Sequence, residues 1–165
     1  MNRSVLAASV AVVALVTPLA GTPGTKTNFS GTWEMDSARS ESPQARDSKG
    51  SETVVIKQTE SEFSVERRRD GQSETIVYKM DGSQTEKPAP DNGPYRWSVK
   101  WDGSKLTTET QRNINRTAVT ITDVLSLAKN GNEMTVNRTL TVQHGYSWQG
   151  AKNYASAKDL FVKVR

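Results

Sequence analysis

The chain has 165 residues, a formal net charge of +4 and no cysteine, and 24% of its residues are charged. This length supports one domain with its own core, and the lack of cysteine excludes both a disulfide framework and a lipid-modified cysteine. Charges of both signs are mixed along the chain without a basic stripe, which argues against nucleic acid as a partner.

Residues 1–24 have the layout of a secretory signal peptide. Arg3 precedes an apolar run from Val5 to Ala20, and Pro18 interrupts that run. The run is shorter than the ~20 residues that cross a bilayer, so we expect cleavage and no stable membrane span afterwards. The sequence therefore predicts a signal peptide at 1–24 and one barrel domain at 25–165. A disulfide-free exported chain favours a bacterial periplasm or secretion. The cleavage site and the oligomeric state stay open.

From residue 29 onward, apolar and polar residues alternate with a period of two, which indicates antiparallel strands. The clearest case is 95–101, where Tyr95, Trp97 and Val99 share one face. Asp70-Gly71 is one of three tight hairpin signals between such segments. We expect strands at 29–35, 52–60, 62–69, 74–81, 95–101, 104–112, 117–128 and 132–142, with 159–165 as a candidate ninth, and loops at 37–50, 82–94 and 143–158.

These short strands and tight turns predict an all-β fold, an antiparallel up-and-down barrel of about eight strands. A sandwich of two stacked sheets is the alternative. Closure into a barrel is favoured because it leaves no exposed sheet edge that could pair with another chain.

The residues Phe29-Ser30-Gly31-Thr32-Trp33 place a Gly-x-Trp pattern on the first strand. Together with Ala38-Arg39-Ser40 and the segment 125–140, this pattern resembles the lipocalins and the wider calycin group, and it looks closest to secreted lipocalin-like proteins of soil bacteria. The resemblance implies a barrel whose closed end is plugged by Trp33, with an arginine from a late strand across the indole. Arg138 and Arg165 are the two candidates, and we choose Arg138. Gly31 would allow a close approach beside the ring.

Catalytic and metal-binding patterns are not found in the sequence. The only histidine is His144, in a predicted loop, and no Gly-x-Ser-x-Gly elbow or clustered metal-ligand spacing occurs. The carboxylates near 60–66 are interleaved with the arginines at 67–69, which is typical of charge pairing on a wet outer surface. We therefore expect no enzymatic activity, no catalytic residue, no metal and no cofactor, haem on His144 included.

The barrel interior leaves two alternatives open, because an eight-stranded barrel is either filled by side chains or holds one small ligand. In the first, the chain is an exported non-enzymatic binding protein for a small apolar or amphipathic molecule. In the second, it is a structural or interaction module of the cell envelope with a filled barrel. A ligand site is expected at the mouth opposite Trp33, lined by Tyr78 and Trp97, with a lid formed by residues 37–50, Tyr146, Trp148 and Tyr154.

Alternation also predicts which side chains point inward. The expected interior residues are Val54, Ile56, Phe63, Val65, Ile76, Tyr78, Trp97, Val99, Leu106, Val119, Ile121, Met134 and Val136.

Overall fold

The computed structural model describes residues 26–46, 52–89, 93–114, 117–143 and 152–164. Within these ranges no helix is long and apolar enough to cross a membrane. The described elements are β1 (Gly31–Met35), α1 (Pro43–Arg46), β2 (Thr53–Gln58), β3 (Glu62–Arg69), β4 (Gln72–Lys79), β5 (Thr85–Lys87), β6 (Tyr95–Asp102), β7 (Lys105–Ile114), β8 (Thr117–Leu127), β9 (Glu133–Gln143) and β10 (Lys152–Lys163).

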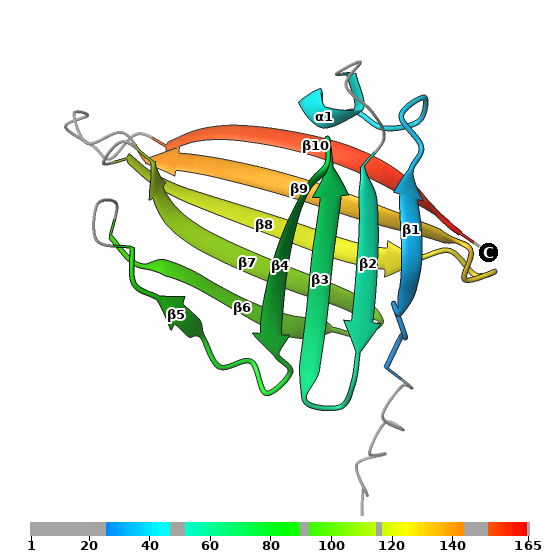
Figure 1. Cartoon of the computed structure of the whole chain (residues 1–165), viewed down its shortest axis with the longest axis horizontal. Helices are drawn as coiled ribbons and strands as arrows, with labels where there is room; N and C mark the ends of the chain where they lie inside the picture. Colours follow the sequence, from blue (N-terminus) through cyan, green and yellow to red (C-terminus); the bar gives the residue numbers. More distant parts are fainter. Residues whose placement is uncertain (1–25, 47–51, 90–92, 115–116, 144–151, 165) are drawn as a thin grey trace, which may run out of the picture.

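All ten strands belong to one antiparallel sheet that curls into a nearly closed barrel (Figure 1). The strand order is β4-β3-β2-β1-β10-β9-β8-β7-β6-β5, so the first and last strands of the chain lie side by side at the centre of the order. Trp33 of β1 pairs with Lys163 of β10 on one side and with Val54 of β2 on the other. The predicted all-β up-and-down barrel is therefore confirmed.

The barrel has a seam between the two ends of the strand order, where β4 lies against β6 without strand pairing. Only β5, three residues long, pairs with the outer edge of β6. Across the seam, the Trp97 indole N–H of β6 donates a 2.7 Å hydrogen bond to the Val77 carbonyl of β4. One side chain thus satisfies an edge carbonyl that no neighbouring strand reaches.

Two of the predicted loops contain strand residues. β5 lies inside the expected loop 82–94, and β10 begins at Lys152, inside the expected loop 143–158. The candidate ninth strand is therefore the end of a longer strand, which pairs with both β9 and β1. Its first half was missed because Ala155 and Ala157, which alternate in register with the buried Asp159, are too small to produce an apolar signal.

Tight turns with positive backbone φ close the hairpins, as predicted. Between β3 and β4, Asp70 has a φ of 52° and Gly71 a φ of 74°. Two consecutive positive values are the requirement of a type I′ turn, whose twist matches that of the flanking strands. The Asp-Gly signal therefore fixes the β3–β4 register.

The buried side chains follow the alternation expected from the sequence. Ile76 and Trp97 are partly buried and pack against the main cluster, and Ile121 is of intermediate exposure. The remaining predicted interior residues are buried. The core is completed by Phe29, Trp33, Met35, Leu125 and Phe161.

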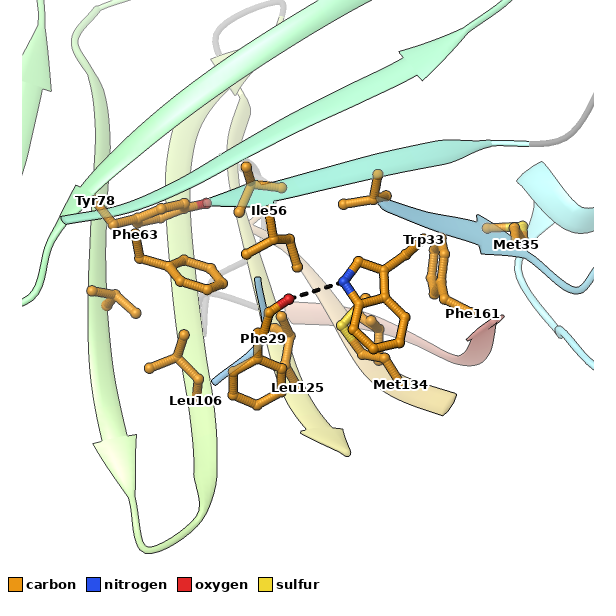
Figure 2. Close-up of a cluster of buried hydrophobic side chains, with 14 residues drawn as sticks. Phe29, Trp33, Met35, Ile56, Phe63, Tyr78, Leu106, Leu125, Met134 and Phe161 are labelled. Atoms are coloured by element: carbon orange, nitrogen blue, oxygen red, sulfur yellow. Dashed lines mark hydrogen bonds between the residues drawn. The ribbon is translucent and has the colours of Figure 1, made fainter. Parts of the chain in front are cut away.

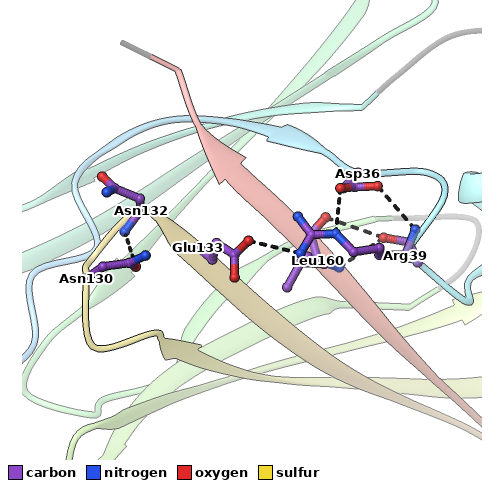
Figure 3. Close-up of polar contacts among 7 residues, drawn as sticks. Asp36, Arg39, Asn130, Asn132, Glu133 and Leu160 are labelled. Atoms are coloured by element: carbon purple, nitrogen blue, oxygen red, sulfur yellow. Dashed lines mark hydrogen bonds and ion pairs between the residues drawn. The ribbon is translucent and has the colours of Figure 1, made fainter.

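The segment after β1 runs along β10 and leads α1 to one end of the barrel (Figures 1 and 3). The backbone N–H of Asp36 donates to the Leu160 carbonyl at 2.8 Å, and the Leu160 N–H donates to Ser40 Oγ at 2.9 Å. The exposed guanidinium of Arg39 forms ion pairs with the carboxylates of Asp36, at 2.7 Å, and Glu133, at 3.0 Å. These pairs tie the segment to the start of β9. The short helix is thereby held against the barrel, where its Ala45 packs against the core cluster.

Candidate functional site

Trp33 is fully buried near the end of the barrel where the chain enters (Figure 2). Its indole N–H donates a 2.9 Å hydrogen bond to the carbonyl of Phe29, the residue two positions before β1. This bond satisfies the one polar atom of the side chain, and a buried indole needs such a partner. The segment before β1 thus folds under the indole.

The cation over the Trp33 ring is Lys163, not Arg138. Lys163 Nζ lies 5.2 Å from the ring centroid, within the range of a cation–π contact. Arg138 pairs with Ala157, which is six residues, roughly 20 Å, from Lys163 along β10. The choice of Arg138 is therefore corrected by the strand register, and Arg165 lies outside the described residues.

Gly31 makes room for the lysine stem. Its φ is +147°, and a Cβ at this position would lie 2.6 Å from Lys163 Cε. Because L-residues rarely adopt this φ, a side chain here would strain the backbone as well as displace the lysine. Gly31 therefore permits the close approach beside the ring that the resemblance implied.

The closed end around Trp33 is filled by its own side chains (Figure 2). The side chains of Phe29, Phe63 and Phe161 are each at most 1% exposed. The rings of Phe29 and Phe63 pack edge to face, with their centroids 6.3 Å apart. The apolar core between this end and the mouth holds a void of about 20 Å³, lined by Phe63 and Phe161 on one side and by Arg67, Tyr78 and Thr108 on the other, which is room for a single water molecule. This half of the barrel is packed like an ordinary protein interior.

A layer of charged side chains lies directly above the apolar core. Asp123 accepts two hydrogen bonds from Arg138, at 2.7 and 2.8 Å, and one from Arg67 at 3.0 Å. Arg67 also donates to Glu52 at 2.6 Å. Two arginines and two carboxylates thus form one ion-pair network inside the barrel, which we call the interior quartet.

The quartet holds Asp123 and Arg138 in the charged state. Burial alone would raise the pKa of Asp123, but the hydrogen bonds and charge of Arg138, with the charge of Arg67, lower that pKa below its usual value. Burial opposes the charged form of Arg138 as well, yet Asp123 raises the pKa of this guanidinium. The two effects have the same origin, because each charge stabilises its partner in a low-dielectric site.

Above the quartet the barrel opens into a cavity of about 190 Å³, which we call the mouth cavity. It lies against β4, β6, β7 and β8, so it runs along the seam. Its wall combines apolar, hydroxyl and charged groups, in contrast to the closed end. The lining residues are Gln44, Arg67, Glu74, Ile76, Tyr78, Tyr95, Thr108, Thr110, Arg112, Ile121, Asp123 and Arg138.

The four residues predicted for a ligand site fall into different places. Tyr78 lines the mouth cavity. Burial raises the pKa of its phenol to about 12, although a hydrogen bond with Thr108 acts in the opposite direction and lowers it. Trp97 does not line this cavity; its ring packs on Tyr95 at 5.0 Å and its N–H bridges the seam. Tyr146 and Trp148 lie outside the described residues.

The expected lid is present only in part. Gln44 of α1, in the segment 37–50, lines the mouth cavity, and Ser42 is buried beside it with its N–H bound to Asp159 at 3.1 Å. Tyr154 is not a lid residue: it is 69% exposed, on the strand face opposite to that of Asp159. Tyr154 has an even residue number and points outward, whereas the buried residues of β10, Asp159 and Phe161, have odd numbers.

The charged lining was missed at the sequence level, although a signal was present. Arg67 has the parity of the buried Val65, and Asp123 has that of Leu125. Interpretation of the arginines at 67–69 as surface residues was therefore wrong for Arg67, which lies inside, while Arg68 is outside and pairs with Glu66. The position of a residue in the strand alternation therefore predicted the direction of its side chain better than its charge did.

No protein-family model matches the chain, and no curated protein sequence matches it either. Similar solved structures include a secretary abundant heat soluble (SAHS) protein from Ramazzottius varieornatus, with a TM-score of 0.60 and 14% identity over 87% of this chain and 100% of that one. The REP1-NXSQ fatty acid transporter has a TM-score of 0.53 and 12% identity, over 83% and 96% of the two chains. A point mutant of that transporter scores 0.51. At these identities the likeness shows the fold alone, a nearly closed antiparallel β-barrel.

Proposed function

We propose that the chain is an exported, non-enzymatic barrel that binds a small amphipathic molecule in the mouth cavity. The single observation behind this proposal is the contrast between a void of about 20 Å³ in the apolar core and a cavity of about 190 Å³ at the mouth. Concave sites with a mixed apolar and polar wall are where proteins bind small molecules.

The wall of the mouth cavity favours an amphipathic ligand over a purely apolar one. Ile76 and Ile121 offer apolar surface, whereas Tyr95 and Arg112 offer hydrogen-bond donors on the same wall. A purely apolar molecule would bury these donors without partners, and each unpaired donor costs binding free energy. A molecule with one polar group and a short apolar stem satisfies both kinds of surface.

The filled core limits how deeply a ligand can enter. The mouth cavity, at about 190 Å³, is smaller than pockets for drug-sized molecules, which measure roughly 300–1,000 Å³, but it shares Glu74, Tyr95 and Arg112 with an adjoining open hollow of about 360 Å³. One similar structure is a fatty acid transporter, which supports an amphipathic ligand class for this barrel. A long acyl chain would have to enter the apolar core, where side chains leave a void of only about 20 Å³. We therefore propose a short-chain ligand, or a longer one that enters only in part.

Export is the second part of the proposal and rests on residues 1–24, which lie outside the described ranges. The name of the secretary abundant heat soluble protein, which has a similar fold, indicates a secreted protein, and this supports an exported barrel. A bacterial periplasm or the extracellular medium is the proposed location. Fractionation of cells that express the full chain, with the mature N-terminus sequenced, tests this part separately from ligand binding.

Native mass spectrometry of the protein purified from its own host tests the binding function. We expect a mass shift from one bound small molecule that is lost on unfolding and returns when the organic extract is added back. A ligand-free barrel that also fails to rebind from the extract would refute the binding function. That result would favour the envelope module, for which the filled closed end is the supporting observation.

A further inference from the structure

The outer face of β8 and β9 is almost free of charge. In β8 the buried residues, such as Leu125, have odd numbers, so the even-numbered residues of 118–126 point outward. In β9 the buried residues, such as Met134, have even numbers, so the odd-numbered residues of 135–143 point outward. None of these ten residues is charged, although 24% of the chain is, and six of them are threonine or serine. Glu133, at the start of β9, is the one charged outward residue of the two strands.

The outer face of β3 has the opposite composition. Three of its four outward residues are charged, namely Glu62, Glu66 and Arg68. Threonine is favoured in strands throughout a sheet, so strand propensity alone does not explain why charge is missing from one wall only. Complementary surfaces match in charge, and the uncharged wall therefore favours a partner that carries no charge.

The hydroxyl groups of this wall lie in register across β8, β9 and β10, which run side by side (Figure 1). Thr122 pairs with Thr139, which pairs with Ser156, and in the next row Thr120 pairs with Thr141. Neighbouring strands lie ~4.8 Å apart. Within the described ranges, none of these five hydroxyls takes part in a hydrogen bond. Their donors and acceptors are therefore free for an external partner.

Tyr154 extends the second row onto β10, where it pairs with Thr141. It is 69% exposed, the largest exposed fraction among the large hydrophobic side chains that the structure describes. An aromatic ring has a negative face, which attracts the C–H groups of a sugar ring, and its phenol adds a hydrogen-bonding group. An exposed ring beside rows of free hydroxyls is thus suited to a carbohydrate.

We propose that the outer face of β8, β9 and β10 binds a neutral polysaccharide. Tyr154 stacks on one sugar ring, and the hydroxyls of Thr141 and Thr139 bond to the hydroxyl groups of the sugars. This site goes beyond the proposed function, because it lies outside the barrel and does not involve the mouth cavity. A protein partner fits less well, since the centre of a protein interface is apolar and aromatic, whereas Val124 is the largest apolar residue among the ten.

Sedimentation of the mature protein with insoluble polysaccharides tests the proposal. The neutral probes are cellulose, β-mannan and granular starch, and alginate beads are the acidic probe. The assay is run in about 1 M salt, at which charges are screened within ~3 Å, so that the positive net charge of the chain does not drive binding. We expect saturable binding to at least one neutral probe and none to alginate.

Substitutions on the wall then locate the site. Tyr154→Ala should weaken binding about tenfold, as expected for an aromatic hot spot, whereas Tyr154→Phe should retain most of the affinity because the ring remains. Thr139→Lys places a long charged side chain on the wall and should weaken binding by a similar factor. Thr75→Lys is the matched control, since Thr75 is an exposed threonine on the outer face of β4. Circular dichroism establishes that each variant is folded.

The outcomes are distinct. If no neutral probe binds wild type, if alginate binds equally well, or if Thr75→Lys weakens binding as much as Thr139→Lys does, the proposal is wrong, and ligand binding at the mouth is unaffected by that result. If Tyr154→Ala instead turns a dimer into a monomer in analytical ultracentrifugation, without polysaccharide binding by wild type, the wall pairs with a second copy and the proposal is also wrong. A loss of polysaccharide binding confined to Tyr154→Ala and Thr139→Lys supports it.

Discussion

The two ends of this barrel are built from the same strands but solve different physical problems. At the closed end, Trp33, Phe63 and Phe161 are buried, and the apolar core beside them leaves a void of only about 20 Å³. At the mouth, the inner strand faces present Arg67 and Asp123, which line a cavity of about 190 Å³. One alternation pattern therefore supplies both a packed core and a polar binding wall.

The contrast follows from how each kind of residue is satisfied. Apolar side chains gain free energy from close packing in any direction, so they fill space. Charged side chains need partners at fixed distances and angles, and a network that meets these demands leaves room around it. We therefore expect the closed end to determine stability and the mouth to determine binding.

The largest expected effect is at the closed end. Trp33→Ala should lower the free energy of unfolding by about 3–5 kcal/mol, because it removes a fully buried indole and leaves a cavity. Urea unfolding followed by circular dichroism measures this loss. Tyr154→Ala, which truncates an aromatic side chain that is 69% exposed, is the control and should change little. Equal stability of Trp33→Ala and wild type would contradict the plug.

Next in size is the interior quartet. Asp123→Asn should destabilise the fold by about 3 kcal/mol, because it leaves Arg138 buried without its carboxylate. The same urea titration applies. Glu66→Gln breaks the exposed pair with Arg68 and serves as the control, with almost no change expected. If both variants unfold at the same urea concentration, the quartet does not contribute to stability.

Acid should weaken the same region. Arg138 and Arg67 lower the pKa of Asp123 in the folded state, against the effect of burial, whereas an unfolded aspartate titrates near ~3.9. A lowered folded pKa contributes stability that is complete above the unfolded pKa and is lost as the pH falls through the folded value. Unfolding free energies measured from neutral pH down to below about pH 4 should therefore fall more steeply for wild type than for Asp123→Asn. Parallel pH curves would show that Asp123 is not the group responsible.

The smallest expected effect is at the surface of the plug. Lys163→Gln removes the cation over the Trp33 ring, 5.2 Å from its centroid, and should cost about 0.5–1 kcal/mol. The Trp33 indole N–H resonance should also shift. Lys158→Gln, on an exposed position of the same strand, is the charge-matched control. A loss of the same size in both variants would point to net charge instead of the ring contact.

Much of the fold was predictable from the sequence, because alternation depends only on the two-residue period of a strand. The parity of Phe63, Leu106 and Met134 placed them correctly in the core. β5 and the first half of β10 were not predictable in this way. Their residues are polar or small, and their strand pairing depends on neighbours that are distant in sequence.

The candidate site was less predictable than the fold. Tyr78 was expected in the cavity wall and lies there, but Asp123 and Arg67 were not expected inside. A charge becomes acceptable in an interior only when its partner is in place, and the partners of Arg67 come from positions 15 residues before it and 56 after it in the chain. The cation over Trp33 was misassigned for the same reason, since the register of β1 with β10 selects Lys163.

The most direct test of the division between the two ends is an amide NMR map of the mature protein titrated with octanoate, a short amphipathic molecule. The account predicts chemical-shift changes at the residues of the mouth cavity, such as Thr108, Thr110 and Ile121, while Phe29, Trp33 and Met134 stay unchanged. Shifts that centre on Trp33 and its neighbours, or no shifts at saturating octanoate, would contradict it.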